Sequence, residues 1–121
     1  LKPALEVVKE LTDSDIKKYG NEVSAFLYDE LTAMNRVRLL GTAKPRVPVF
    51  SFSVDGVHHE DLAQILDKMG VAVRSGQMCA EPLMDRFGVT GMLRASLAPY
   101  NTMEEAEYFI KSLDKAIAML V

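Results

Sequence analysis

The chain has 121 residues, a formal net charge of −3, 49% apolar residues and 26% charged residues. This length suffices for one domain with its own core, and the balance of apolar and charged residues excludes general disorder. Lys and Arg are scattered and no apolar run approaches the ~20 residues of a membrane span, so we expect neither a nucleic acid nor a membrane as partner.

The cysteine and histidine content also limits the possible functions. One cysteine cannot form an internal disulfide, which is typical of a reducing compartment, and we expect a cytoplasmic protein. The same cysteine and two adjacent histidines have no metal-ligand spacing, so we expect no metal site.

The first 34 residues predict two helices. Apolar residues recur at helical spacing over residues 1–11, Thr12 to Asp15 supply good helix caps, and a second apolar face continues to Met34. The sequence begins inside a periodic pattern without a Met, so we expect it to belong to a longer protein. We treat residues 1–34 as a helical lead-in to an α/β core over residues 35–121, together one domain.

The core alternates between short strands and helices. Phe50, Phe52 and Val54 alternate with Ser51 and Ser53, as in a strand with one buried face. The same reasoning predicts strands at 37–40, 47–54, 71–74 and 92–97, helices at 58–69 and 102–120, and a helical turn at 83–87. With few crossovers, the expected fold class is α+β: a small, mostly antiparallel sheet covered by helices.

The single cysteine, Cys79, lies in a loop-like segment. It follows a strand end and a predicted turn at residues 74–76, and Pro82 is expected to keep a helix from running through it. Such a position favours an exposed thiol, and Arg74 nearby favours the nucleophilic thiolate. A structural cysteine is usually buried inside a strand or helix, so this segment alone leaves both roles open.

Residues 74–84, reading RSGQMCAEPLM, resemble the active-site cysteine loop of the Suf-type (group II) cysteine desulfurases. These are pyridoxal-phosphate enzymes related to class V aminotransferases. Two further stretches resemble the same family in the same order along the chain, Phe50–His58 and Leu93–Ser96 with Tyr100–Thr102. The resemblance implies the small C-terminal domain of a fold-type I enzyme.

The resemblance also implies a reaction and its site residues. Cys79 is then the nucleophile that takes sulfur from L-cysteine, leaving L-alanine and a persulfide that passes to a sulfur-acceptor protein, as in iron–sulfur cluster assembly. Arg94 is then a bidentate clamp on the substrate carboxylate, and Arg74 helps to shape the same site. Without the resemblance, both arginines would be ordinary charged residues on strands.

The cofactor is not expected to be bound by this chain alone. Pyridoxal phosphate and its lysine belong to the large domain of such enzymes, and no lysine here has the expected histidine–lysine setting. We therefore expect the isolated chain to be inactive, with a bare apolar surface where the large domain of the same polypeptide docks. The full-length enzyme is expected to be a homodimer.

One departure from the family concerns the two residues before the cysteine. The family commonly has two histidines there, whereas this chain has Gln77 and Met78, neither of which is an acid or base near neutral pH. If a histidine assists proton transfer, this member is slower, uses other groups or prefers another substrate. His58 and His59 are expected to begin the middle helix rather than to act in catalysis.

Four alternatives remain open at this point, and one of them is a redox-sensing thiol protein, although the chain contains no second cysteine to resolve an oxidised thiol. Selenocysteine lyases share the fold and the motifs. A class V relative with another substrate would leave Cys79 as a structural residue. A small α+β regulatory module would bind a metabolite and perform no chemistry.

Overall fold

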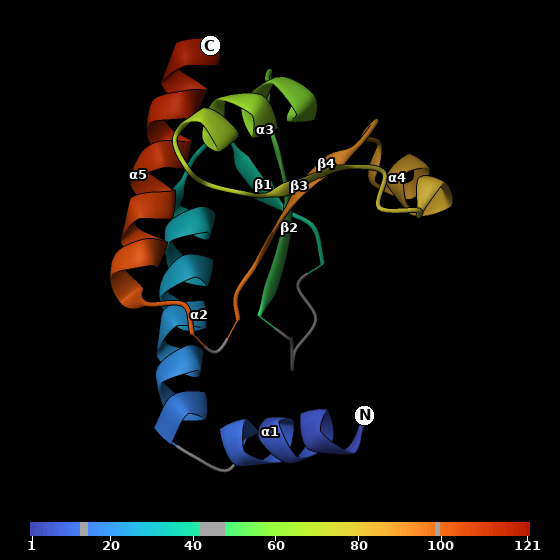
Figure 1. Cartoon of the computed structure of the whole chain (residues 1–121). Coiled ribbons are helices and arrows are strands. Elements are labelled where there is room, and N and C mark those ends of the chain that lie inside the picture. Colours follow the sequence, from blue (N-terminus) through green and yellow to red (C-terminus); the bar gives the residue numbers. More distant parts are fainter. Residues whose placement is uncertain (13–14, 42–47, 99) are drawn as a thin grey trace.

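A computed structural model describes residues 1–12, 15–41, 48–98 and 100–121 (Figure 1). The described helices and strands, in chain order, are α1 (Lys2–Thr12), α2 (Asp15–Ala33), β1 (Val37–Leu39), β2 (Val49–Val54), α3 (His59–Lys68), β3 (Arg74–Gly76), α4 (Glu81–Phe87), β4 (Met92–Ser96) and α5 (Met103–Leu120).

The four described strands form one antiparallel sheet in the order β1-β2-β4-β3. In its centre, Phe50 pairs with Ala95 and Phe52 pairs with Leu93. Residues paired across neighbouring strands point to the same face, so these four side chains share one face. The predicted α+β class with a mostly antiparallel sheet is therefore confirmed.

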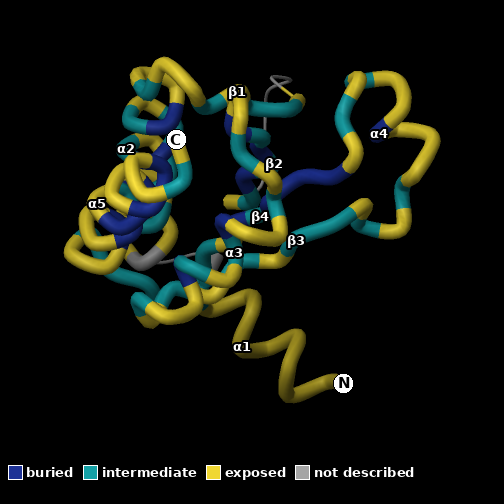
Figure 2. The backbone as a smooth tube through the Cα atoms, turned by 90° about the horizontal axis from the view of Figure 1, so that it is seen from above, coloured by how far each residue is buried: buried dark blue, intermediate teal, exposed yellow. Residues whose placement is uncertain are grey.

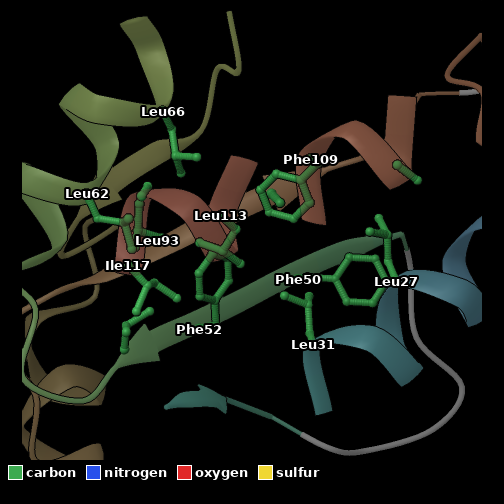
Figure 3. Packing of buried hydrophobic residues seen from close by; sticks show 14 of the residues in the cluster. Leu27, Leu31, Phe50, Phe52, Leu62, Leu66, Leu93, Phe109, Leu113 and Ile117 are labelled. Atoms are coloured by element: carbon green, nitrogen blue, oxygen red, sulfur yellow. The ribbon is translucent and has the colours of Figure 1, made fainter. Parts of the chain in front are cut away.

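Helices α2, α3 and α5 cover that apolar face. Phe50 and Phe52 are almost fully buried, and the Phe52 ring meets Phe109 of α5 edge-on at a centroid distance of 6.4 Å. Figure 3 shows how leucines from α2 and α3 close the same cluster. Because the helices cover this face, side chains of the sheet that bind or react with other molecules must lie on the opposite face.

The strand before Cys79 was predicted too early. Residues 71–73 are not a strand, and β3 occupies Arg74–Gly76, where a turn was expected. Gly70 takes a left-handed φ of +81° and the Val71 N–H donates to the Leu66 carbonyl, so this segment closes α3 before it can join the sheet. The β-branched Val71 and Val73 pack against the core instead of pairing.

The helix after Cys79 is longer than predicted. It begins at Glu81, not at residue 83, and Pro82 lies in its first turn. Proline is tolerated there because the first N–H groups of a helix have no partner within the helix. Pro82 thus helps to start α4, and no helix runs through Cys79, as predicted.

The other predicted elements are found within one or two residues of their expected ends, apart from two regions. Residues 13–14 of the predicted cap cluster, residues 42–46 of a predicted loop and residue 47 of the strand predicted at 47–54 lie outside the described residues. Thr102 and Glu105 form the expected capping box at the start of α5. Among the described residues, no helix is both long and apolar enough to cross a membrane.

Helix α1 lies apart from the sheet, and most of its residues are exposed (Figure 2). Three apolar side chains at helical spacing are exposed here: Leu1, just before the helix, at 94%, and Leu5 and Val8, within it, at 59% and 55%. An apolar stripe of this kind usually packs against another surface. It has the character of the docking surface that the sequence led us to expect.

Candidate functional site

The face of the sheet opposite the helices carries polar residues from all four strands. Arg38 of β1 pairs with Ser53 of β2, and Ser51 of β2 pairs with Arg94 of β4. Arg94 in turn pairs with Arg74 of β3. Because side chains alternate along a strand and paired residues share a face, three arginines and two serines lie on this face.

Arg74 and Arg94 are directly opposite each other, which is unfavourable for two cations. Like charges at such a cross-strand position destabilise a sheet unless an anion lies between or beside them. The Nε atom of Arg94 is also buried and has no hydrogen-bond partner among the described residues. A buried donor without an acceptor costs about 1–3 kcal/mol. Both observations point to an anionic group that completes this part of the site.

Cys79 lies in a tight turn three residues beyond the end of β3. The Ala80 N–H donates to the Gln77 carbonyl at 2.9 Å, and the two central residues, Met78 and Cys79, have φ angles of +55° and +57°. Positive φ at both central residues is the signature of a type I′ turn, which normally contains Asn or Gly. The left-handed conformation costs an ordinary residue about 1–2 kcal/mol.

This strained turn keeps the Cys79 thiol exposed, as predicted. Non-glycine residues in the left-handed region are concentrated at functional sites, where the surrounding structure maintains them. An exposed thiol at the tip of such a turn can be reached both by a small substrate and by another protein. The turn is therefore suited to a group that must be loaded and then unloaded.

Residues 77–91, which we call the Cys79 excursion, leave the sheet after β3 and return at β4. Helix α4 lies within the excursion, away from the three core helices (Figure 1). Among the described residues of α4, Met84 is the one with a buried side chain, and it is 1% exposed. The site thus consists of a fixed part, the arginines of the sheet, and an outlying part, the Cys79 excursion.

His58 and His59 begin α3, as expected. The His58 Nδ1 accepts the Glu60 N–H as the N-cap of the helix. The His59 ring stacks on the His58 ring. Burial lowers the pKa of His59 below 6.5, and the nearby charge of His58 lowers it further, whereas the charge of Glu60 raises it. A methyl group on Gly91 would overlap the His59 ring, so His59 packs against the chain just before β4.

Sequence reasoning did not single out Ser51 or Arg38. The alternation in β2 placed Ser51 on the polar face, but its pairing with Arg94 needed the strand register. The Arg38 guanidinium donates to the Phe87 carbonyl at the end of α4, over 49 positions of sequence, and no local signal predicts such a contact. No group of three or more metal-ligating His, Cys, Asp or Glu side chains occurs among the described residues.

The family model for class V aminotransferases matches residues 1–109. The chain belongs to the class V aminotransferase family. It is 46% identical over 120 residues to a probable cysteine desulfurase of Xylella fastidiosa strain Temecula1, covering 99% of this chain and 29% of that protein. The chain thus spans about 29% of the length of such curated relatives.

Two solved structures of the family have the same fold. The cysteine desulfurase CsdA of Escherichia coli is 33% identical with a TM-score of 0.80, over 93% of this chain and 29% of that one. An apo cysteine desulfurase of Thermococcus onnurineus is 30% identical with a TM-score of 0.83, over 95% of this chain and 29% of that one. The resemblance to cysteine desulfurases and the predicted α+β fold class are therefore confirmed.

Class V aminotransferases use pyridoxal phosphate, and the described residues fit one side of such a site. The open sheet face offers arginines with an unpartnered Nε, which suit the carboxylate of an amino-acid substrate. All lysines that the structure describes lie on helices α1, α2, α3 and α5, whereas the cofactor needs a lysine at its ring. The described residues therefore fit the carboxylate side of such a site.

Proposed function

We propose that this chain is part of a pyridoxal-phosphate-dependent cysteine desulfurase of the Suf type (group II), which forms L-alanine and a persulfide on Cys79 from L-cysteine. One observation carries the proposal: an exposed thiol on a strained turn follows a strand whose Arg74 opposes Arg94, an arginine with an unpartnered buried Nε. Relatives that are named cysteine desulfurases match nearly the whole chain.

The two arginines are proposed to bind the substrate carboxylate. The planar guanidinium of Arg94 can accept this group in a bidentate manner, and β2 and β4 hold its backbone in place. Arg74 stands beside it, so a bound carboxylate would also relieve the repulsion between the two cations. Ser51, on the other side of Arg94, supplies a hydroxyl in the same row.

Cys79 is proposed to receive the sulfur. The cofactor, when bound, supplies the electron sink that labilises the Cβ–S bond of the substrate. The Cys79 thiolate then attacks the substrate sulfur, so that an S–S bond forms while the Cβ–S bond breaks. The bonding electron pair stays with the carbon, which takes up a proton and leaves as alanine. The exposure of Cys79 leaves the persulfide accessible to an acceptor.

Gln77 and Met78 make the protonation of this site unusual for the family. Neither side chain exchanges a proton near neutral pH, so neither activates the thiol as a base. Gln77 is exposed and Met78 half-buried, and both belong to the turn that carries the cysteine. We propose that their contribution is to the turn and its surface, and that proton transfer falls to groups outside these residues.

The remaining parts of the enzyme are also proposals. Residues 1–121 form one small C-terminal domain, with residues 1–34 leading into the core at residues 35–121. A large domain of the same polypeptide holds the cofactor, the full-length enzyme is a homodimer, and a cytoplasmic sulfur-acceptor protein takes the persulfide toward iron–sulfur cluster assembly. The exposed apolar stripe on α1 supports the existence of a large partner surface.

The decisive experiment uses the full-length protein and three variants, Cys79→Ala, Arg94→Ala and Arg86→Ala. The cofactor absorbance is recorded first, and alanine and persulfide are then measured from L-cysteine. We expect Cys79→Ala to abolish persulfide formation and Arg94→Ala to raise KM for cysteine. Arg86 is an exposed arginine of α4 and serves as the matched control with little effect.

Two results would change the assignment. Alanine production that is unaffected by Cys79→Ala would move the protein to another class V reaction and leave Cys79 as a structural residue. A kcat/KM for selenocysteine far above that for cysteine would make it a selenocysteine lyase instead.

A further inference from the structure

Apart from the packing of His59 against Gly91 at its C-terminal end, the Cys79 excursion is weakly attached to the rest of the molecule. Its internal hydrogen bonds connect residues 77–91 to one another: Ala80 donates to Gln77, and Val89 donates to Met84. Helix α4 contributes a single buried side chain, Met84, among the described residues. A segment with few buried contacts and mostly internal hydrogen bonds opens at low cost, so its position needs a specific anchor.

Arg38 provides such an anchor from a distant strand. Its guanidinium lies 3.1 Å from the Phe87 carbonyl oxygen, the last carbonyl of α4. This hydrogen bond joins the Cys79 excursion to β1, a strand that the excursion does not directly follow or precede. Because β1 and β3 are opposite edges of the sheet, the contact ties the far end of the excursion back across the open face.

The chemistry of this contact suits an anchor. The last carbonyls of a helix have no partner within the helix, and they carry the negative end of its dipole. Gly88 closes α4 in the left-handed conformation, with its N–H and that of Val89 returning to Asp85 and Met84. Those bonds use other carbonyls, so the Phe87 carbonyl remains available to a cation.

We propose that Arg38 is a positioning residue, which sets where the Cys79 excursion lies relative to Arg74 and Arg94 and thereby sets the rate of sulfur transfer to Cys79. The catalytic part of this inference rests on the proposed function; the anchoring part does not. Arg38 itself is exposed and lies on β1, two strands away from Arg94 in the sheet order. It therefore acts through α4 and not through the substrate clamp.

The expected effects follow from this division of the site. Without the guanidinium, the end of α4 is released while the sheet that holds Arg74 and Arg94 is unchanged. We expect Arg38→Ala to lower kcat for persulfide formation on the order of five-fold, with KM for L-cysteine unchanged, because one exposed hydrogen bond of ordinary strength is lost. Arg38→Lys keeps a cationic donor and is expected to recover part of the rate.

The test compares amide hydrogen exchange and kinetics in the full-length protein and its Arg38→Ala, Arg38→Lys and Arg36→Ala variants. Arg36 is a matched control, since it is an exposed arginine that donates to another backbone carbonyl, that of Asp55, at 3.3 Å. We expect Arg38→Ala to accelerate exchange about five-fold within residues 77–91, with other regions unchanged, and Arg36→Ala to leave residues 77–91 as in the parent.

The outcomes separate the anchor from the reaction. Unchanged exchange in residues 77–91 of Arg38→Ala, or an equal effect of Arg36→Ala there, would overturn the inference. Faster exchange with unchanged kcat would overturn its catalytic part. If the parent protein forms no persulfide, the proposed function fails, and the exchange data still decide whether Arg38 holds the excursion. If Arg38→Ala cannot be purified in folded form, Arg38→Met, which keeps the side-chain length and removes the donor, gives the same comparison.

Discussion

The packing of His59 against Gly91 can be tested with one added methyl group. A Cβ on Gly91 would lie 2.8 Å from both Cδ2 and Cε1 of the His59 ring, and closer still to Nε2. Real carbon atoms do not approach so closely, so the ring or the strand must move. Gly91→Ala is therefore an overpacking change, for which the usual cost is about 1–3 kcal/mol. Gly91 does not have a left-handed φ, so backbone strain adds nothing to this cost.

The same methyl group should be harmless once the ring is absent. In a His59→Ala background, Gly91→Ala has room and restricts the unfolded chain, which stabilises a protein by about 0.4–1 kcal/mol. The change in sign makes the coupling between the two positions about 1.5–4 kcal/mol in a double-mutant cycle. Gly20→Ala is the control, because nothing lies within 4 Å of its added Cβ within α2, and we expect it to stabilise the chain.

Urea unfolding of the four proteins at pH 7.5, where His59 is neutral, measures the cycle. A loss on Gly91→Ala that is the same with and without His59 would refute the reasoning, because it would place the cost outside the ring contact. A neutral Gly91→Ala in the parent would do the same, since it would show that the ring does not occupy this space.

Three further predictions concern the same chain. Since burial lowers the pKa of His59 below 6.5, the unfolded chain binds more protons than the folded chain on the acid side. The free energy of unfolding should fall as the pH drops below about 6.5, and His59→Gln should flatten this dependence in urea titrations at several pH values. Thr102→Ala removes one half of the capping box with Glu105 and should cost about 1 kcal/mol in the same assay, whereas no measurable loss would argue against that cap. Phe52→Ala removes a fully buried ring together with its edge-on contact to Phe109 and should cost about 3–5 kcal/mol; a cost below 1 kcal/mol would be incompatible with the core described above.

The core of this protein was predictable because its signal is a repeated pattern. Phe50, Phe52 and Val54 alternate with serines, and the periods of the long helices agree with burial in α2 and α5. Many residues contribute to each such pattern, so no single residue decides it. The same redundancy explains why the element ends were less certain, since an end depends on one or two residues.

The segment around Cys79 could be predicted only in part, for identifiable reasons. Val71 and Val73 are good strand formers, but tertiary packing against the core kept them out of the sheet. Met78 and Cys79 are poor candidates for a type I′ turn, and their backbone conformation contradicts local preference. Natural proteins usually depart from local sequence preferences at functional sites, so the unfavourable backbone conformation of this turn is itself a sign of a functional site.

The two faces of the sheet explain why the site needed the structure. The buried face consists of apolar residues that alternate along each strand, and this alternation can be seen in the sequence. Which residues come together on the open face depends on which strands are neighbours, and the sequence pattern does not show this. Arg74 and Arg94 are 20 positions apart and become opposed through the pairing of β3 with β4. The repulsion between Arg74 and Arg94 destabilises the sheet, so an anion bound beside them best explains why two arginines stand opposite each other. In the proposed function, the exposed thiol that follows β3 gives that anion a chemical purpose, because a substrate held by its carboxylate would present its sulfur to Cys79.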